Sequence, residues 1–388
     1  MLAARIETKH MNTGILILAL IVFVSIYGGF HFYLYRKLVR LLPHYRRHII
    51  VTLVIFGCSV FVVEIFTHGN IQAFFVAPLS WFTFLWMGFV YLFFVLSVAF
   101  DLFAKLAQAA GIDSAVRHLA SPRRTIWLSI VVIGVGVYGY FSAKQINIER
   151  VAVESAKLSQ PIRLVLIADV HLGLLSEERH IARIVDEINA IEPDVIVSAG
   201  DLVDMQLDHL ENLVAQMARL NARLGKYTVY GNHEVLAGIE QARAFTERAG
   251  FELLSNTGKA VNGVINIIGV DDPAVEGRIQ YSSVNEVELL MRYSNGPFNL
   301  LLKHQPVVET QSLEYFDLQL SGHVHGGQIF PFGLLTGMVY PVPLGLSQVD
   351  SDSWLYVSRG TGTWGPPIRL LAPPEITVID LIPVKARE

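Results

Sequence analysis

Cysteine and charged residues are scarce in this sequence, and each scarcity narrows what the protein can be. The 388 residues include one cysteine, Cys58, which excludes an internal disulfide and a metal cluster built from thiolates. Cys58 lies in an apolar stretch, so we expect it to be buried and inert. Charged residues make up 16% of the chain, whereas soluble domains contain about a quarter. A large apolar block must therefore account for part of the sequence.

Neither acidic nor basic residues are in large excess. The net charge is −4, which indicates no surface for nucleic acid. The sequence contains no internal repeat and no low-complexity tract. Nothing in it indicates an obligate protein partner.

Four apolar runs lie in the first 145 residues, at approximately residues 14–35, 49–67, 75–100 and 125–142. Each meets or approaches the ~20 residues that a helix needs to cross a bilayer. The first run is long and lacks a clear small-residue cleavage site, so we expect a membrane span and not a removable signal peptide. The sequence thus predicts a helical transmembrane domain of four spans over residues 1–145, with the lipid bilayer as its partner.

Lysine and arginine are distributed unevenly between the spans. They are frequent in the first and third connections and absent from the second connection, residues 68–74. Because basic residues favour the cytoplasmic side, we expect a multi-pass protein of the cell membrane whose second half is extracytoplasmic. Glu64 lies within the second run, and we expect it near the outer end of the span or against a neighbouring helix.

The second half of the chain has the pattern of an α/β domain. A polar segment, residues 146–160, is expected to be a linker. Over residues 161–388, short apolar runs typical of buried strands alternate with segments of helical spacing, such as 177–191 and 207–224. A domain of this length can bury a core of its own.

Acidic and histidine side chains follow the predicted strands in five segments. These are Asp169–His171, Gly200–Asp204, Gly231–Glu234, His304 and Gly322–His325. Open α/β sheets place their sites at such strand ends. Carboxylate, imidazole and amide donors without thiolate suit manganese, iron or zinc, whereas calcium and magnesium prefer a cage of oxygens.

The order of these segments, D-x-H, G-D-x-x-D, G-N-H-E, an isolated histidine and G-H-x-H, resembles the calcineurin-like metallophosphoesterase superfamily over roughly residues 161–383. The resemblance implies an α/β/β/α sandwich, in which two mixed sheets pack face to face with helices outside. It also implies two divalent metal ions that activate a hydroxide to attack phosphorus. Its ligands for one ion would be Asp169, His171, Asp201 and His325. Those for the other would be Asp201, Asn232, His304 and His323.

The resemblance also implies roles for residues that bind no metal. His233 matches the family's non-ligand histidine, which acts as a general acid or stabilises charge on the departing oxygen. Asp204 would form a hydrogen bond with His233 and raise its proton affinity. Asn232 would contact the substrate as well as a metal, and Glu234 would support the site indirectly.

Further segments are similar to the bacterial membrane-associated or exported branch of the superfamily. They are Ser321–Ile329, Tyr356–Gly360, Pro367–Leu370 and Ala372–Ile376. Some relatives in that branch act on lipid-linked pyrophosphate or phosphodiester substrates, although this chain differs from many of them by its four predicted spans. Arg359 and Arg369 could hold phosphate through paired hydrogen bonds, and the alternative is that both arginines are structural.

Together these patterns predict a metal-dependent hydrolase of phosphodiester or pyrophosphate bonds, in substrates that include lipid-linked ones. One alternative is a phosphatase or phosphodiesterase of soluble substrates. A second is a non-catalytic membrane receptor or scaffold that binds metal. The complete ligand set together with His233 favours an enzyme.

The segment Gly326–Val349, which follows two predicted ligands, contains no charged residue. Its prolines and glycines argue against a helical span, so we expect an apolar loop. Such a loop is either exposed toward lipid or substrate, or folded inward as part of the core.

Overall fold

The computed structural model describes residues 13–68, 73–112, 123–204, 207, 210–276, 284–294 and 296–384. The N-terminus and parts of the second and third predicted connections lie outside these ranges. The chain divides into two compact units. One is Met1–Phe141 with Gly365–Ile368, and the other is Ser142–Trp364 with Arg369–Glu388.

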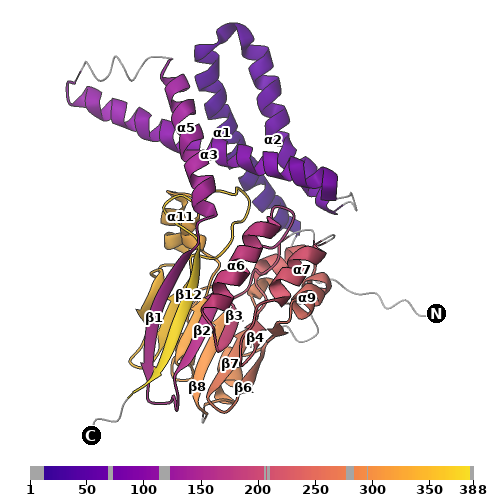
Figure 1. Ribbon diagram of the computed structural model, residues 1–388. Coiled ribbons are helices and arrows are strands. Elements are labelled where there is room, and N and C mark those ends of the chain that lie inside the picture. Colours follow the sequence, from indigo (N-terminus) through magenta and orange to yellow (C-terminus); the bar gives the residue numbers. More distant parts are fainter. Residues whose placement is uncertain are drawn as a thin grey trace. The chain divides into compact units, whose positions relative to one another are not determined.

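The four apolar runs are all helical in the first unit. They form α1 (Thr13–Leu41), α2 (Arg46–His68), α3 (Ala73–Ala109) and α5 (Arg124–Ala143), and a single turn, η1 (Pro43–Tyr45), precedes α2 (Figure 1). Among the described residues, three segments are long and apolar enough to cross a membrane: Pro43–Phe66, Val76–Ala109 and Arg124–Ala143. Three of the four predicted spans thus coincide with helices of sufficient length and apolar composition. The arrangement of four spans stays a prediction.

A partly buried charge cluster connects three of these helices. The carboxylate of Asp101 on α3 accepts hydrogen bonds from Tyr33 and Lys37 of α1 and from Arg124 of α5. Lys37 Nζ lies 2.6 Å from Asp101 Oδ2. Charged groups next to an apolar medium are costly unless they are paired, so this cluster fixes the helices at one end.

Cys58 is exposed on α2, so the expectation that it is buried is wrong. In a soluble domain an apolar neighbourhood indicates burial, but the apolar surface of a membrane helix can face lipid. Glu64 is also exposed, in the last part of α2.

The second unit is built on two six-stranded mixed sheets. The first has the order β1-β12-β2-β3-β4-β5. Its strands are β1 (Asn147–Ser155), β2 (Ile162–Ile167), β3 (Val195–Ser198), β4 (Lys226–Thr228), β5 (Glu252–Leu253) and β12 (Glu375–Pro383). The second has the order β10-β11-β9-β8-β7-β6. Its strands are β6 (Thr257–Val261), β7 (Ile265–Val270), β8 (Phe298–Lys303), β9 (Leu318–Ser321), β10 (Gly345–Gln348) and β11 (Trp354–Val357).

Helices cover the outer faces of both sheets, which completes the expected sandwich. They are α6 (Glu178–Ala190), α7 (Glu211–Ala218), α8 (Asn232–Ala237), α9 (Ile239–Arg248) and α10 (Glu286–Met291). The helix expected over residues 207–224 is shorter than predicted. Three further single turns are η2 (Pro273–Val275), η3 (Thr310–Ser312) and η4 (His325–Gly327). Helices α6, α7 and α9 lie over the first sheet, where Ile184 and Ile188 of α6 pack among its buried side chains (Figure 1).

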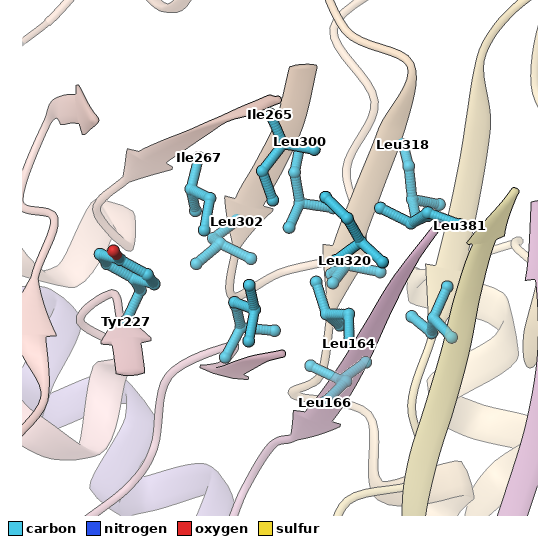
Figure 2. Packing of buried hydrophobic residues seen from close by; sticks show 14 of the residues in the cluster. Leu164, Leu166, Tyr227, Ile265, Ile267, Leu300, Leu302, Leu318, Leu320 and Leu381 are labelled. Carbon is cyan, nitrogen blue, oxygen red and sulfur yellow. The ribbon is translucent and has the colours of Figure 1, made fainter. Parts of the chain in front are cut away.

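The core between the sheets is continuous and apolar. Leu164 and Leu166 of β2 face Leu300, Leu302 and other side chains of the second sheet (Figure 2). Alternate residues of each strand point inward, as the pleat requires. Each fully buried leucine contributes about 1.5–3 kcal/mol, so this layer holds the strand ends in fixed positions.

The segment Gly326–Val349 does not form the expected loop throughout. It contains a short helix, α11 (Phe332–Val339), that begins directly after Pro331. Proline removes no hydrogen bond at the start of a helix, which is why it did not prevent this one. In the described structure none of the α11 residues is buried.

The segment expected to be a linker is instead a strand of the first sheet. β1 pairs in parallel with β12 from Asn147 opposite Glu375 to Ser155 opposite Pro383. Its residues are mostly exposed because β1 is an edge strand, and this made the segment look like a polar connection. Only residues 144–146 separate α5 from β1.

A comparison of two fragments would test the contribution of β1. A fragment that starts at Ser142 keeps this strand, whereas one that starts at Leu158 removes it and exposes the backbone edge of β12. We expect the shorter fragment to melt at a Tm lower by about 5–10 °C, equivalent to ~2–3 kcal/mol, and to aggregate through the open edge. Circular dichroism melting and light scattering measure both effects. Equal Tm values and two monodisperse fragments would show that β1 is dispensable.

Candidate metal centre

The predicted ligands follow five strands whose C-terminal ends meet at one edge of the sandwich. Asp169 and His171 follow β2, Asp201 follows β3 and Asn232 follows β4 in the first sheet. In the second sheet His304 follows β8, and the pair His323 and His325 follows β9. β2, β3 and β4 are parallel to one another, as are β8 and β9. Stacking of the two sheets therefore brings both groups of side chains together.

The side chains form overlapping groups with ligand atoms within 4.8 Å of one another. One group is Asp169, His171 and His325, another is Asp201, His304 and His323, and a third is His171, Asp201 and His233. Asp201 thus belongs to the second and third of these groups, and it lies next to the first group.

Short distances define the two sides of the centre. On one side, the Nε2 atoms of His171 and His325 lie 3.0 Å apart, and Asp169 Oδ1 lies 3.6 Å from His325 Nε2. Asp201 Oδ2 lies 3.8 Å from His171 Nε2 and 3.1 Å from His304 Nε2, so its carboxylate stands between the sides.

On the other side, His304 Nε2 is surrounded by possible ligand atoms. It lies 3.1 Å from His323 Nδ1 and 3.2 Å from Asn232 Oδ1. His304 Nδ1 lies 2.8 Å from the carbonyl oxygen of Ala199, to which it can donate a hydrogen bond. Such a bond fixes the ring so that Nε2 faces the centre, as is usual for a histidine that binds metal.

The protonation of these groups fits divalent cations. Burial lowers the pKa of His171 to about 4 and that of His325 well below its ordinary value, so both imidazoles are neutral. Burial also raises the pKa of the Asp169 carboxyl to about 7. Among the described residues, His171 Nδ1 has no hydrogen-bond partner. Neutral imidazoles and carboxylates that face one another in a buried space are stabilised by a bound cation.

The protonation of His304 also fits a bound divalent cation. Burial lowers its pKa, but the charge of Asp201 and the hydrogen bond to it outweigh burial and raise the pKa to about 10. Without metal, a proton between His304 and Asp201 neutralises the carboxylate. A metal ion bound there would replace this proton.

The backbone of the centre is strained at five ligands. The φ angles are 52° at Asp169, 52° at His171, 50° at Asp201, 71° at His323 and 50° at His325. Each such residue costs of order 1 kcal/mol or more, and such strain persists only where the surrounding structure enforces it. No pattern in the sequence indicated these conformations.

Two motif glycines permit the close approach of backbone to ligand. A Cβ at Gly322 would overlap the Asp169 carboxylate, and one at Gly231 would overlap the Asp201 carboxylate. The motifs therefore need glycine next to their ligands for reasons of space.

Glu234, whose role the sequence left uncertain, joins two of the loops. Its buried carboxylate accepts hydrogen bonds from the backbone N–H groups of Leu202 and Gly231, both at 2.7 Å, and of Asp201 at 3.1 Å. It therefore positions the loop that carries the shared ligand.

His233 stands beside the ligands without joining the two main groups. Its Nδ1 lies 2.7 Å from Asp204 Oδ1, and its ring packs edge-on against His171 with centroids 4.5 Å apart. Burial lowers the pKa of His233, but the hydrogen bond to Asp204 and the nearby carboxylates outweigh it and raise the pKa to about 9. His233 is thus protonated at neutral pH.

The two predicted phosphate-binding arginines are occupied by the protein itself. Arg369 is fully buried, and its guanidinium donates to the carbonyl oxygens of His325 at 2.9 Å and Arg359 at 2.6 Å. Arg359 forms ion pairs with Glu149 at 2.5 Å and Glu375 at 2.7 Å. These contacts favour a structural role for both arginines. The sequence could not show this, because the carbonyls and acids that bind them are distant in the chain.

A polar chain beside the centre was not singled out in the sequence. The Tyr340 ring lies edge-on to His323, with centroids 5.2 Å apart, and its hydroxyl donates to Gln305 Oε1 at 2.9 Å. Gln305 Nε2 in turn donates to Asp272 Oδ2 at 2.7 Å. Tyr340 is distant in sequence from the other two residues, so no local signal connects them.

Substitution of Gly322 by alanine would test the close packing around Asp169. The added methyl group overlaps the carboxylate, so Gly322→Ala should lose bound metal and reduce phosphoesterase turnover by at least ~10²-fold, because ligands must be held within about 0.5 Å. Gly337→Ala in α11 is the matched control, since in the described structure a Cβ there meets nothing within 4 Å. Elemental analysis and turnover of both purified variants provide the measurement. Normal metal content in Gly322→Ala would contradict the packing argument.

Comparison with known proteins gives consistent matches. The sequence profile of calcineurin-like phosphoesterases matches residues 162–327. An uncharacterized metallophosphoesterase of Aquifex aeolicus is 32% identical over 255 residues, which cover 65% of this chain and 97% of that protein. One from Campylobacter jejuni is 31% identical over 75% of this chain and 78% of its own length. A Danio rerio transmembrane protein with metallophosphoesterase domain is 32% identical over 71% of this chain and 66% of its own length.

Proposed function

Because this chain belongs to the calcineurin-like metallophosphoesterase family, a family of metal-dependent phosphoester hydrolases, we propose that its centre cleaves phosphodiester or pyrophosphate bonds. The observation that carries the proposal is a pair of neighbouring ligand groups, one of Asp169, His171 and His325 and one of Asp201, His304 and His323. Asp201 links them, because its Oδ2 lies 3.8 Å from His171 Nε2. The apolar helices of the first unit and the name of the Danio rerio relative indicate a membrane protein.

The distances between the side chains support two ligand sets. Asp169, His171, Asp201 and His325 would hold one divalent ion. Asp201, Asn232, His304 and His323 would hold the other. When bound, the two ions would supply an activated water and neutralise charge on the phosphoryl oxygens. Histidine-rich ligand sets favour manganese, iron or zinc.

His233 is the proposed general acid. Its proton on Nδ1 is held by Asp204, which leaves Nε2–H to donate to the departing oxygen. The raised pKa keeps the imidazolium form available at neutral pH. Asn232 would position the substrate through its amide, and Glu234 acts only through the loops that it joins.

The exposed apolar helix α11 favours lipid-linked substrates over soluble ones. It begins seven residues after His325, so an amphipathic phosphoester could keep its tails in lipid while its phosphate reaches the centre. We keep the extracytoplasmic orientation as part of the proposal, on the basis of the basic connections. The domain boundary is proposed near residue 145, with β1 included in the catalytic domain. Soluble phosphoesters remain the competing substrate class, and a receptor without turnover is the competing function.

The shared carboxylate provides the most direct test. Asp201→Asn should remove both bound ions and reduce hydrolysis of an aryl phosphodiester by at least ~10³-fold, because one group serves two ions. Asp186→Asn on the exposed side of α6 is a matched control. Elemental analysis and a colorimetric assay of the full chain in detergent measure both quantities. Retention of two ions with near-normal turnover would refute the site.

Replacement of His233 tests proton donation separately from metal binding. His233→Ala should keep its metal ions and lose ~10²–10⁴ in rate, with a smaller loss for aryl esters whose leaving groups need little protonation. His233 must be protonated to donate, so the activity that needs this proton is present below the pKa that His233 has in the metal-loaded enzyme and falls as pH rises through it. A pH–rate profile should show this alkaline limb in the native chain and not in the variant. Equal losses for all leaving groups would contradict the role.

A further inference from the structure

The α11 segment exposes an unusual amount of apolar surface. Leu334 is 66% exposed, Met338 79% and Val339 70%. Phe330, Phe332 and Leu335 are exposed as well, and no charged residue occurs between Gly326 and Val349. A contiguous apolar surface without charged residues is typical of a contact with lipid or another protein.

Both ends of this segment are attached to the metal centre. At its start, the backbone N–H of Leu370 donates to Gln328 at 2.8 Å, and the N–H of Phe330 donates to Leu370 at 3.1 Å. At its end, Tyr340 packs against the ligand His323. The apolar surface therefore lies beside the centre and moves with it.

Strand directions place the centre at the edge where the chain enters the domain. β1 and β12 are parallel, and the N–H of Asn147 at the start of β1 donates to Pro374 at 2.9 Å. β2 is antiparallel to β12, with Leu166 opposite Thr377, so β2 ends where β1 begins. Asp169 follows directly. The same edge carries α11, through the contact of Phe330 with Leu370 (Figure 1).

The connection to the membrane is short. Residues 144–146 join β1 to α5, which is long and apolar enough to be a membrane span. Three residues reach at most about 10–11 Å. The chain itself therefore limits how far the start of β1 can lie from the end of α5.

We propose that α11 and its flanking phenylalanines insert into the bilayer interface and hold the metal-centre edge of the domain against the lipid headgroups. The occupant of this surface is the bilayer itself, at the boundary between headgroups and acyl chains. Because Gly326–Val349 carries no lysine or arginine, insertion should depend on apolar contact and not on anionic lipid. The proposal concerns the position of the domain and does not depend on which phosphoester is cleaved.

Fluorescent labels in the full chain would test this contact. Cys58→Ala first removes the only cysteine, and Leu335→Cys or Met338→Cys then introduces a site for a polarity-sensitive dye. The protein is placed in phosphatidylcholine nanodiscs with or without lipids that carry a quencher on the acyl chain. Ser351→Cys is the matched control, because this exposed residue precedes β11 at the opposite edge of the sheet.

Labels at Leu335 and Met338 should be quenched at least about twofold by the acyl-chain quencher, and the label at Ser351 should not be. Added anionic lipid or salt should leave the quenching unchanged. Labels on α11 that report water would overturn the proposal. Labels that are shielded from water but not quenched by lipid would show that protein covers α11, and they would overturn it as well. Thermal unfolding of each labelled protein verifies that the domain is folded.

Discussion

The shared carboxylate of Asp201 is the group on which the rest of the centre depends. It is buried between two sets of histidines, where the backbone N–H of His233 donates to it at 2.8 Å and its charge is further stabilised by a proton or by bound cations. The remaining features keep it in place. Glu234 holds the backbone N–H of Asp201, and Gly231 leaves room for its side chain. In the proposed function, a charge held between two ligand groups would allow one site to bind two ions close together.

The sandwich supplies the rigidity that this arrangement needs. Five ligands have left-handed backbone conformations, which are unfavourable by themselves. The apolar layer between the sheets fixes the strands that precede them, so the loops have little freedom to relax (Figure 2). Arg369 adds to this by holding the carbonyl oxygens around His325 from a fully buried position. The packed core thus keeps the side chains at the strand ends in fixed positions.

The strand order also decides which edge of the domain carries the metal centre. β1 follows α5 after three residues, 144–146, and its parallel pairing with β12 sets the direction of every other strand in the first sheet. The metal ligands consequently lie at the edge where the chain arrives. A site at the opposite edge would have needed β1 to run in the other direction. The exposed side chains of α11 lie at this same edge.

The sequence by itself determined the reaction class and the kind of fold. Its five motif segments predicted a ligand set whose side chains the fold brings together, and the apolar runs identified the helices, because residue type and periodicity are local properties. Three features were settled only by the tertiary structure. Residues 147–155 of the expected linker proved to be a strand, since an edge strand does not have to be apolar. Arg359 and Arg369 proved to be bound to acids and carbonyls distant in sequence, such as Glu149. The left-handed backbone at the predicted ligands and the exposure of α11 depend on how distant parts of the chain pack together. No local sequence pattern encodes that packing.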